Sequence, residues 1–264
     1  MTRLTPTFKT LKAQNKAGFI AYVMAGDPDR ATTLEMLKGL ADNGADIIEL
    51  GMPFTDPMAD GPTIQRAAIR ALDGGMTLTG TLDIVKEFRA THADTPIVLM
   101  GYANPLHMMG FEQVAAAMSE AGADGLICVD IPPEEDNALR EALEAKGLSF
   151  IRLAAPTTDD ARLPQVVANT SGFVYYVSTT GVTGAGSGQT GDIKSAVERV
   201  RTASGLPVAV GFGVKTPARA AEIAGIADAV VVGSAIVDTL DTGGVASALQ
   251  LASSLAEAAH NAQR

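Results

Sequence analysis

The chain has 264 residues, of which 47% are hydrophobic and 19% are charged, and its formal net charge is −10. This composition is typical of a globular protein with a sizeable core, and the negative charge argues against a nucleic-acid partner, because neutralising phosphates requires a basic surface. No apolar run reaches the roughly 18 residues needed to cross a bilayer, the N-terminus lacks the apolar core of a secretory signal, and Cys128 is the single cysteine, so we expect a cytoplasmic protein without disulfides or membrane contact.

Eight short apolar runs follow one another along the chain, and helix-period segments separate them. Such runs are typical of parallel strands covered on both faces. Their alternation without a linker predicts a single TIM-barrel domain, a (β/α)₈ fold over residues 1–264, with an N-terminal helix and extra short helices. An open doubly wound sheet is the alternative, but VMAGDPDR stands after the first run, where a dinucleotide fold would carry GxGxxG. The runs are residues 18–26, 45–53, 96–104, 124–132, 148–156, 172–181, 207–214 and 227–235.

One of the predicted helices, within residues 132–147, begins with three acidic residues, Glu134, Glu135 and Asp136. We interpret them as charge complementarity to the positive end of the helix rather than as a metal site. The three histidines are scattered, so the sequence predicts no metal site elsewhere either.

The most informative loop follows the second apolar run and reads ELGMPFTDPMADGPTIQ, residues 49–65. Active sites of this fold lie at the carboxyl ends of the strands. Side chains alternate along a strand, so Ile48 and Leu50 should face the helices while Glu49 faces the barrel axis. A partly buried carboxyl has a raised pKa and can exchange a proton near neutral pH. The alternative is that a buried hydrogen bond holds Glu49.

Two further carboxylates, Asp56 and Asp60, stand in the same loop. Asp60 can reach over the barrel mouth beside Glu49, or it can cap the helix that we expect to begin near Pro62. We interpret Asp56 as a turn residue or a partner contact.

Glycine-rich loops follow the last three apolar runs, at residues 181–188, 211–214 and 232–235. Glycine lets backbone N–H groups approach an anion, and a short helix starting after Gly233-Ser234 would point its N–H groups at a phosphate. The loops after strands seven and eight are the usual phosphate site of this fold. The alternative is that these glycines serve turns alone.

A Schiff-base enzyme would need a lysine at a strand end, and Lys215, just after GFGV, is the one candidate. We interpret Lys215 as a solvated loop residue. The remaining interpretation is acid–base chemistry by carboxylates, without a cofactor, on a phosphorylated small molecule.

The loop motif also carries a family resemblance. Residues 49–67, ELGMPFTDPMADGPTIQRA, closely resemble the hallmark of the tryptophan synthase α-subunit family, and the resemblance continues in order through YANP, VDIPPEE, APTTDD, GVTG, GFGV and VGSAIV. It implies a retro-aldol cleavage of indole-3-glycerol phosphate to indole and glyceraldehyde 3-phosphate. It also implies an α₂β₂ complex in which indole passes to a β subunit that carries pyridoxal phosphate, while this chain itself holds no cofactor.

The resemblance also assigns roles residue by residue. It implies Glu49 and Asp60 as the catalytic pair, with Tyr175 near the scissile bond and Thr183 in a lid. Tyr22 stands where phenylalanine is common in the family, and the segment His107-Met108-Met109 is more apolar than expected. The implied phosphate ligands are Gly184, Gly213, Gly233 and Ser234; the implied indole pocket is Tyr22, Met100, Tyr102, Ile127, Val129 and Leu153; the implied partner contacts are Asp56, Pro57 and Asn104.

Two other functions remain open at this point. The first is another phosphate-binding TIM-barrel enzyme, an isomerase or an aldolase. The second is a barrel without catalysis that binds and activates a partner.

Overall fold

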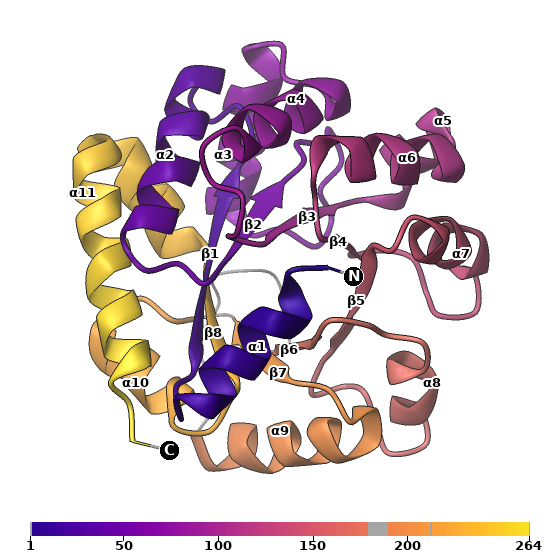
Figure 1. Cartoon of the computed structure of the whole chain (residues 1–264), viewed down its shortest axis with the longest axis vertical. Coiled ribbons are helices and arrows are strands. Elements are labelled where there is room, and N and C mark those ends of the chain that lie inside the picture. Colours follow the sequence, from indigo (N-terminus) through magenta and orange to yellow (C-terminus); the bar gives the residue numbers. More distant parts are fainter. Residues whose placement is uncertain (1, 179–189, 212, 264) are drawn as a thin grey trace.

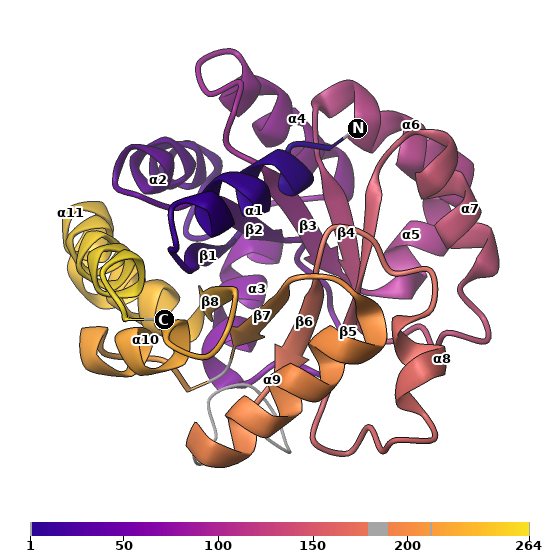
Figure 2. The same cartoon turned by 60° about the horizontal axis from the view of Figure 1, so that its bottom comes forward.

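The computed structural model describes residues 2–178, 190–211 and 213–263. Eight parallel strands each pair with the next along the chain, and the last pairs with the first, so the sheet closes into a barrel (Figures 1 and 2). This confirms the TIM-barrel prediction, and each strand lies within one of the eight predicted runs. The strands are β1 (Gly18–Met24), β2 (Ile47–Gly51), β3 (Ile97–Gly101), β4 (Gly125–Cys128), β5 (Ser149–Ala154), β6 (Val174–Val177), β7 (Val208–Gly211) and β8 (Ala229–Val232).

The described residues contain eleven helices, and most of them form a ring around the strands (Figure 1). The predicted N-terminal helix is present as α1, and α3 and α5 are additional helices in the connections that follow β2 and β3. None of the helices in the described part of the chain is long and apolar enough to span a membrane. The helices are α1 (Leu4–Ala13), α2 (Arg30–Asp42), α3 (Pro62–Asp73), α4 (Leu78–Arg89), α5 (Ala103–Met109), α6 (Phe111–Ala121), α7 (Asn137–Ala145), α8 (Leu163–Val167), α9 (Thr190–Ser204), α10 (Pro217–Ala224) and α11 (Ser234–His260).

Local sequence explains where several helices begin. The Asp29 carboxylate caps α2 by accepting a hydrogen bond from the backbone N–H of Thr32, and Thr77 and Thr216 cap α4 and α10 in the same way. The helix predicted after Gly233-Ser234 does begin at Ser234, but it is not short. It continues to His260 with one break at Gly244, whose φ of 74° and ψ of −178° are not helical.

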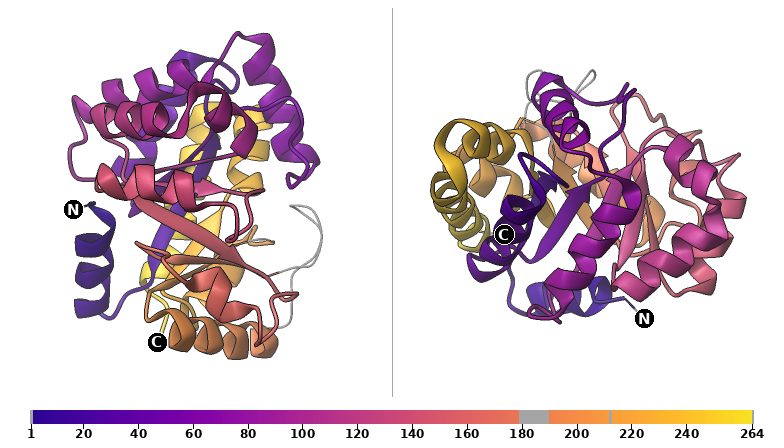
Figure 3. Two further views of the ribbon diagram at one scale, coloured as in Figure 1. Left: turned by 90° about the vertical axis from the view of Figure 1, so that its right-hand side faces the viewer. Right: turned by 90° about the horizontal axis from the view of Figure 1, so that it is seen from above.

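The interior of the barrel is filled at its amino-terminal end. Inward-facing side chains of the strands form one cluster, which includes Ile20, Ile47 and Val98, and α1 closes this cluster from below with Leu4 and Phe8. Figure 3 shows α1 lying at one end of the barrel. The opposite end, where the strands finish, therefore remains for a functional site.

The acidic residues before α7 lie only partly where the helix-dipole interpretation places them. Asp136 is the N-cap residue of α7, but its side chain makes no capping hydrogen bond, and Glu134 and Glu135 precede the helix, which begins at Asn137. Glu134 forms an ion pair with Arg162, and the buried carboxylate of Asp136 lies 2.5 Å from the guanidinium of Arg152. Both arginines belong to later segments of the chain, so tertiary ion pairing adds a second role for Glu134 and Asp136, whereas Glu135 is exposed.

Candidate active site

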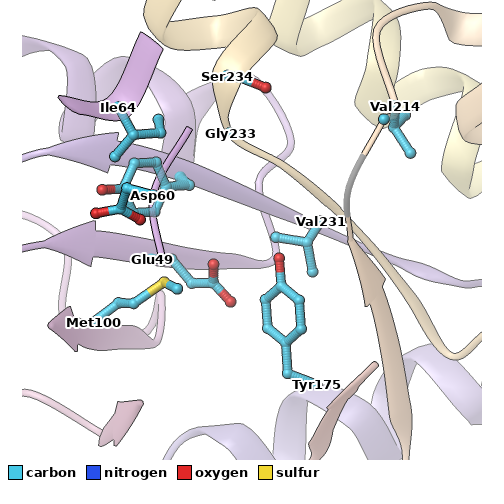
Figure 4. A pocket seen from close by; sticks show the side chains of 11 residues that line it. Glu49, Asp60, Ile64, Met100, Tyr175, Val214, Val231, Gly233 and Ser234 are labelled. Atoms are coloured by element: carbon cyan, nitrogen blue, oxygen red, sulfur yellow. The ribbon is translucent and has the colours of Figure 1, made fainter. Parts of the chain in front are cut away.

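An open cavity lies at the carboxyl ends of the strands (Figure 4). It brings together eight of the residues that the sequence singled out, from segments spread between positions 22 and 234. Its lining residues are Tyr22, Glu49, Asp60, Ile64, Met100, Tyr175, Gly213, Val214, Val231, Gly233 and Ser234.

Glu49 lies on β2 and faces into this cavity, whereas its neighbours Ile48 and Leu50 belong to the outer core between strands and helices. Its side chain is only 1% exposed. The Oε1 atom has no hydrogen-bond partner in the described residues, which removes the alternative that a buried hydrogen bond holds this atom. Burial raises the pKa of Glu49 to about 8, because desolvation disfavours the charged carboxylate. Near neutral pH, most Glu49 carboxyls therefore carry a proton.

Asp60 lies in the loop between β2 and α3, and Tyr102 holds this loop. The Tyr102 hydroxyl accepts a hydrogen bond from the N–H of Ala59 over 3.1 Å and donates one to the Asp60 carboxylate. Burial raises the pKa of Asp60 to about 6, and the bond from Tyr102 opposes this rise. The alternative that Asp60 caps α3 is wrong, since the capping residue is Gly61 and no side chain makes the capping bond.

Tyr175 projects from β6, and its hydroxyl end and the Glu49 carboxyl point toward one another (Figure 4). The hydroxyl lies over Gly211 of the neighbouring strand, where an added Cβ would come within 2.1 Å of it. Burial raises the pKa of Tyr175 well above its usual value, and the nearby Glu49 charge adds to this rise. Tyr175 thus remains a neutral hydroxyl, and Gly211 leaves the space that this hydroxyl occupies.

The opposite wall of the cavity is made of backbone. Gly233 directly follows β8 and is the N-cap residue of α11, whose first residue is Ser234. The first N–H groups of a helix lack partners within the helix. Gly213 also lines this wall, with a φ of 77° that favours glycine. Such a wall can bind an anion. The predicted residues Thr183 and Gly184 lie outside the described residues.

Four residues of the implied indole pocket do not line the cavity. Tyr102 instead contacts the Asp60 loop. Ile127 is fully buried in the inner barrel cluster, and Val129 and Leu153 pack against that cluster while remaining partly exposed.

Sequence analysis did not single out three of the residues that line the cavity: Ile64, Val214 and Val231. Strand alternation does contain a signal for Val231, because it stands two residues after Ala229 on β8, and both side chains face the barrel interior.

Of the three positions predicted to meet a partner, Asp56 and Pro57 lie in the loop after β2 and Asn104 lies in the first turn of α5. Asp56 and Asn104 are exposed, and Pro57 is half-buried. Beside them, Met58 is 77% exposed and Met108 is 78% exposed. The apolar His107-Met108-Met109 segment is not an open loop but part of α5.

Two other sequence interpretations concern reactive side chains. Lys215 is exposed and does not line the cavity, in agreement with its interpretation as a solvated residue. No group of three His, Cys, Asp or Glu side chains in the described ranges could hold a metal ion.

Cys128 is buried beside Asp130. Burial, and to a smaller extent the charge of Asp130, raises the pKa of its thiol to about 12.

Comparison with known proteins identifies relatives along almost the whole chain. A family model described as tryptophan synthase alpha chain matches residues 8–263. The tryptophan synthase alpha chain of Caulobacter sp. (strain K31) is 64% identical over 239 residues, which cover 90% of this chain and 87% of the relative. The corresponding protein of Phenylobacterium zucineum is 62% identical over 236 residues, covering 89% and 85%.

Solved structures agree with this match. A chain of Mycobacterium tuberculosis tryptophan synthase superposes with a TM-score of 0.92 at 40% identity and covers 98% of both chains. The tryptophan synthase subunit alpha of Legionella pneumophila gives a TM-score of 0.90 at 37% identity, with 98% of each chain covered. The chain therefore belongs to the tryptophan synthase alpha chain family, a family of lyases of tryptophan biosynthesis.

Proposed function

We propose that this chain cleaves indole-3-glycerol phosphate to indole and glyceraldehyde 3-phosphate by a retro-aldol reaction. The observation that carries the proposal is the buried Glu49 carboxyl, which faces a cavity whose far wall is the N-terminus of α11. A proton-carrying acid and an anion-binding wall in one cavity match a substrate with a reactive ring at one end and a phosphate at the other.

Glu49 is the acid–base group of this reaction. In its neutral form it donates a proton to the ring carbon that bears the glycerol chain. The resulting carboxylate accepts the proton of the adjacent glycerol hydroxyl, the bond between ring and chain breaks, and its electron pair restores the aromatic ring. The proton count balances, so the reaction needs no outside acid. A pKa of about 8 suits both steps, because neither protonation state is strongly disfavoured near neutral pH.

Asp60 and Tyr175 act on the ring and the chain respectively. The Asp60 carboxylate accepts a hydrogen bond from the indole N–H and stabilises the positive charge that develops when the ring carbon is protonated. Tyr175 offers a neutral hydroxyl on the other side of Glu49, near the bond that breaks.

The phosphate lies against Gly213, Gly233 and Ser234, where backbone N–H groups bind it without a lysine or arginine. Gly184, with Thr183 as a lid residue, belongs to the same proposal but lies outside the described residues. The indole ring contacts Tyr22 and Met100 in the cavity, and Tyr102, Ile127, Val129 and Leu153 support that side of the barrel.

Glu49→Gln tests the assignment, because it keeps the size of the side chain while removing its proton exchange. We expect indole release to fall at least about 10²-fold, the lower range of a general acid–base contribution. The measurement is indole formed from indole-3-glycerol phosphate, with circular dichroism and thermal melting as checks on folding. A folded variant that keeps its parent's rate would remove Glu49 from the mechanism.

The second part of the proposal concerns a partner. Tryptophan synthase structures are among the similar solved structures, and two methionines with 77% and 78% exposure flank the predicted contacts Asp56, Pro57 and Asn104. We therefore propose that this face docks on a β subunit in an α₂β₂ complex. The β subunit carries pyridoxal phosphate and receives the indole, and this chain holds no cofactor of its own.

A further inference from the structure

Tyr22 spans one wall of the cavity between two glycines. At its inner end, a Cβ added to Gly233 would lie 3.3 Å from the Tyr22 Cβ. At its outer end, a Cβ added to Gly51 would lie 2.1 Å from the Tyr22 hydroxyl oxygen. The ring is thus fixed at both ends, and the hydroxyl occupies the space that any side chain at position 51 would need.

The Tyr22 hydroxyl has little to bind in its present surroundings. The side chain is 7% exposed, and in the described part of the chain its hydroxyl has one hydrogen-bond partner, the sulfur of Met24 at 4.0 Å. A thioether is a weak acceptor, and a buried hydroxyl without a good acceptor costs free energy. The pKa of Tyr22 is raised by burial and then by the charges of Asp60 and Glu49, so the group is a neutral donor close to both carboxyls.

Among the described residues, Tyr102 is the side chain that donates a hydrogen bond to the Asp60 carboxylate. The Tyr102 hydroxyl donates to it from the β3 side of the loop. A carboxylate has two oxygens that together accept up to about four hydrogen bonds. Tyr22 lies on β1 and lines the same cavity as Asp60, so a hydrogen bond from its hydroxyl would come from a different strand than the bond from Tyr102.

We propose that Tyr22 is a positioning residue whose hydroxyl, held over Gly51, donates a hydrogen bond to the Asp60 carboxylate when the cavity is occupied. With Tyr102 it forms a pair of phenol donors that keep Asp60 charged and direct its free lone pairs at the ring N–H. This inference rests on the proposed function, because it assumes that Asp60 acts as a carboxylate.

The test uses Tyr22→Phe, which keeps the ring between Gly233 and Gly51 and removes only the donor. We expect the acid limb of the pH profile of kcat/KM to move upward by about half a unit or more, since loss of a donor to the charged form raises a carboxyl pKa. We expect kcat to fall roughly ten-fold, the scale of one hydrogen bond to a charged group, while KM changes little.

The control is Met24→Leu, which removes the present sulfur contact of the hydroxyl by a swap of similar volume. Its acid limb should coincide with that of the parent. In the variant Gly51→Ala, the added Cβ takes the space of the Tyr22 hydroxyl and displaces it. This variant should move the acid limb in the same direction as Tyr22→Phe.

A second readout separates this inference from the proposed function. Carbon NMR of labelled aspartate, with the Asp60 signal assigned by its loss in Asp60→Asn, gives the Asp60 pKa in the presence of indole and inorganic phosphate. A higher pKa in Tyr22→Phe than in the parent supports the inference even if the parent does not cleave indole-3-glycerol phosphate. Equal Asp60 pKa values in parent and variant overturn the inference, whatever the parent's activity.

Discussion

Two carboxyls in one cavity have raised pKa values, Glu49 at about 8 and Asp60 at about 6. The difference has a physical cause, because Glu49 is fully enclosed without a donor at Oε1 while Asp60 receives the bond from Tyr102. Between these two values, Glu49 carries its proton while Asp60 has lost its own. The different surroundings of two similar side chains thus make Glu49 a proton donor and Asp60 a charged carboxylate at the same pH.

This separation predicts the pH dependence of catalysis. Activity requires protonated Glu49 and charged Asp60, so kcat/KM should fall below about pH 6, where Asp60 is protonated, and above about pH 8, where Glu49 is ionised. The measurement is a pH profile of indole release. In Asp60→Asn the residual activity should lose its acid limb and keep the basic one. Two unchanged limbs in that variant would contradict the assignment.

The same burial predicts a pH-dependent stability. The pKa of Glu49 rises from 4.5 to about 8 on folding. The native state therefore holds this proton more tightly than the unfolded chain does, and stability is lost as pH rises through this window. Glu49→Gln has no such titrating group, so its free energy of unfolding minus that of the parent should increase by on the order of a few kcal/mol from pH 5 to pH 8. Urea unfolding of both proteins at the two pH values measures this difference, and a difference that does not change with pH would contradict the burial argument.

At the scale of elements, α3 connects the Asp60 side of the cavity with the helix α11, which begins at the opposite wall. This helix starts two residues after Asp60. Arg70 in its last turn donates two hydrogen bonds, of 2.6 and 2.9 Å, to the buried carboxylate of Asp27. The same guanidinium reaches Asp241 of α11, the helix whose first residue lines the anion wall. Arg70 thus fixes the helix beside the Asp60 loop against both the segment that follows β1 and α11.

Arg70→Met should therefore destabilise the protein by roughly 3 kcal/mol, because it leaves the Asp27 charge buried without its partner. Asp27 is only 2% exposed. The matched control is Arg66→Met on the same helix, whose ion pair with Asp238 is about half exposed on both sides and should contribute less than about 1 kcal/mol. Chemical denaturation compares the two, and equal losses would argue against a clamp at Arg70.

Sequence patterns predicted this architecture well because each strand carries its own signal. A run such as residues 45–53 is apolar on both faces, and the alternation around Glu49 placed its carboxyl correctly without any tertiary information. Contacts between distant segments carry no such signal. The ion pair of Asp136 with Arg152, the Tyr175 hydroxyl over Gly211 and the cavity contact of Ile64 each depend on how separate loops meet.

At the scale of the whole molecule, the two ends of the barrel serve different purposes. The amino-terminal end is sealed by α1, where the N–H and guanidinium of Arg3 bind the buried carboxylate of Asp124, to which Arg89 also donates. The carboxyl-terminal end holds the cavity and the exposed methionines. The amino-terminal end is thus closed by stability contacts, whereas the carboxyl-terminal end combines the candidate functional contacts with the Arg70 ion pairs.

The proposed docking face can be tested at Met108. Met108→Glu puts a charge where an apolar contact is expected, so it should weaken binding to the β subunit by at least about ten-fold. Cleavage by the isolated chain should not change. The control is Ile69→Glu, since Ile69 on α3 is also exposed, at 58%, but is not one of the predicted contacts. Titration calorimetry with the β subunit measures both, and equal effects would contradict the assigned face.

The enclosed thiol of Cys128 has a practical consequence for such measurements. It is the single cysteine of the chain, and with a pKa of about 12 it offers almost no thiolate to alkylating reagents at neutral pH. A cysteine introduced on the surface, for example at Met108, would thus be the one position to accept a maleimide fluorophore. The native sequence already permits site-selective labelling, without first removing a residue from the barrel wall.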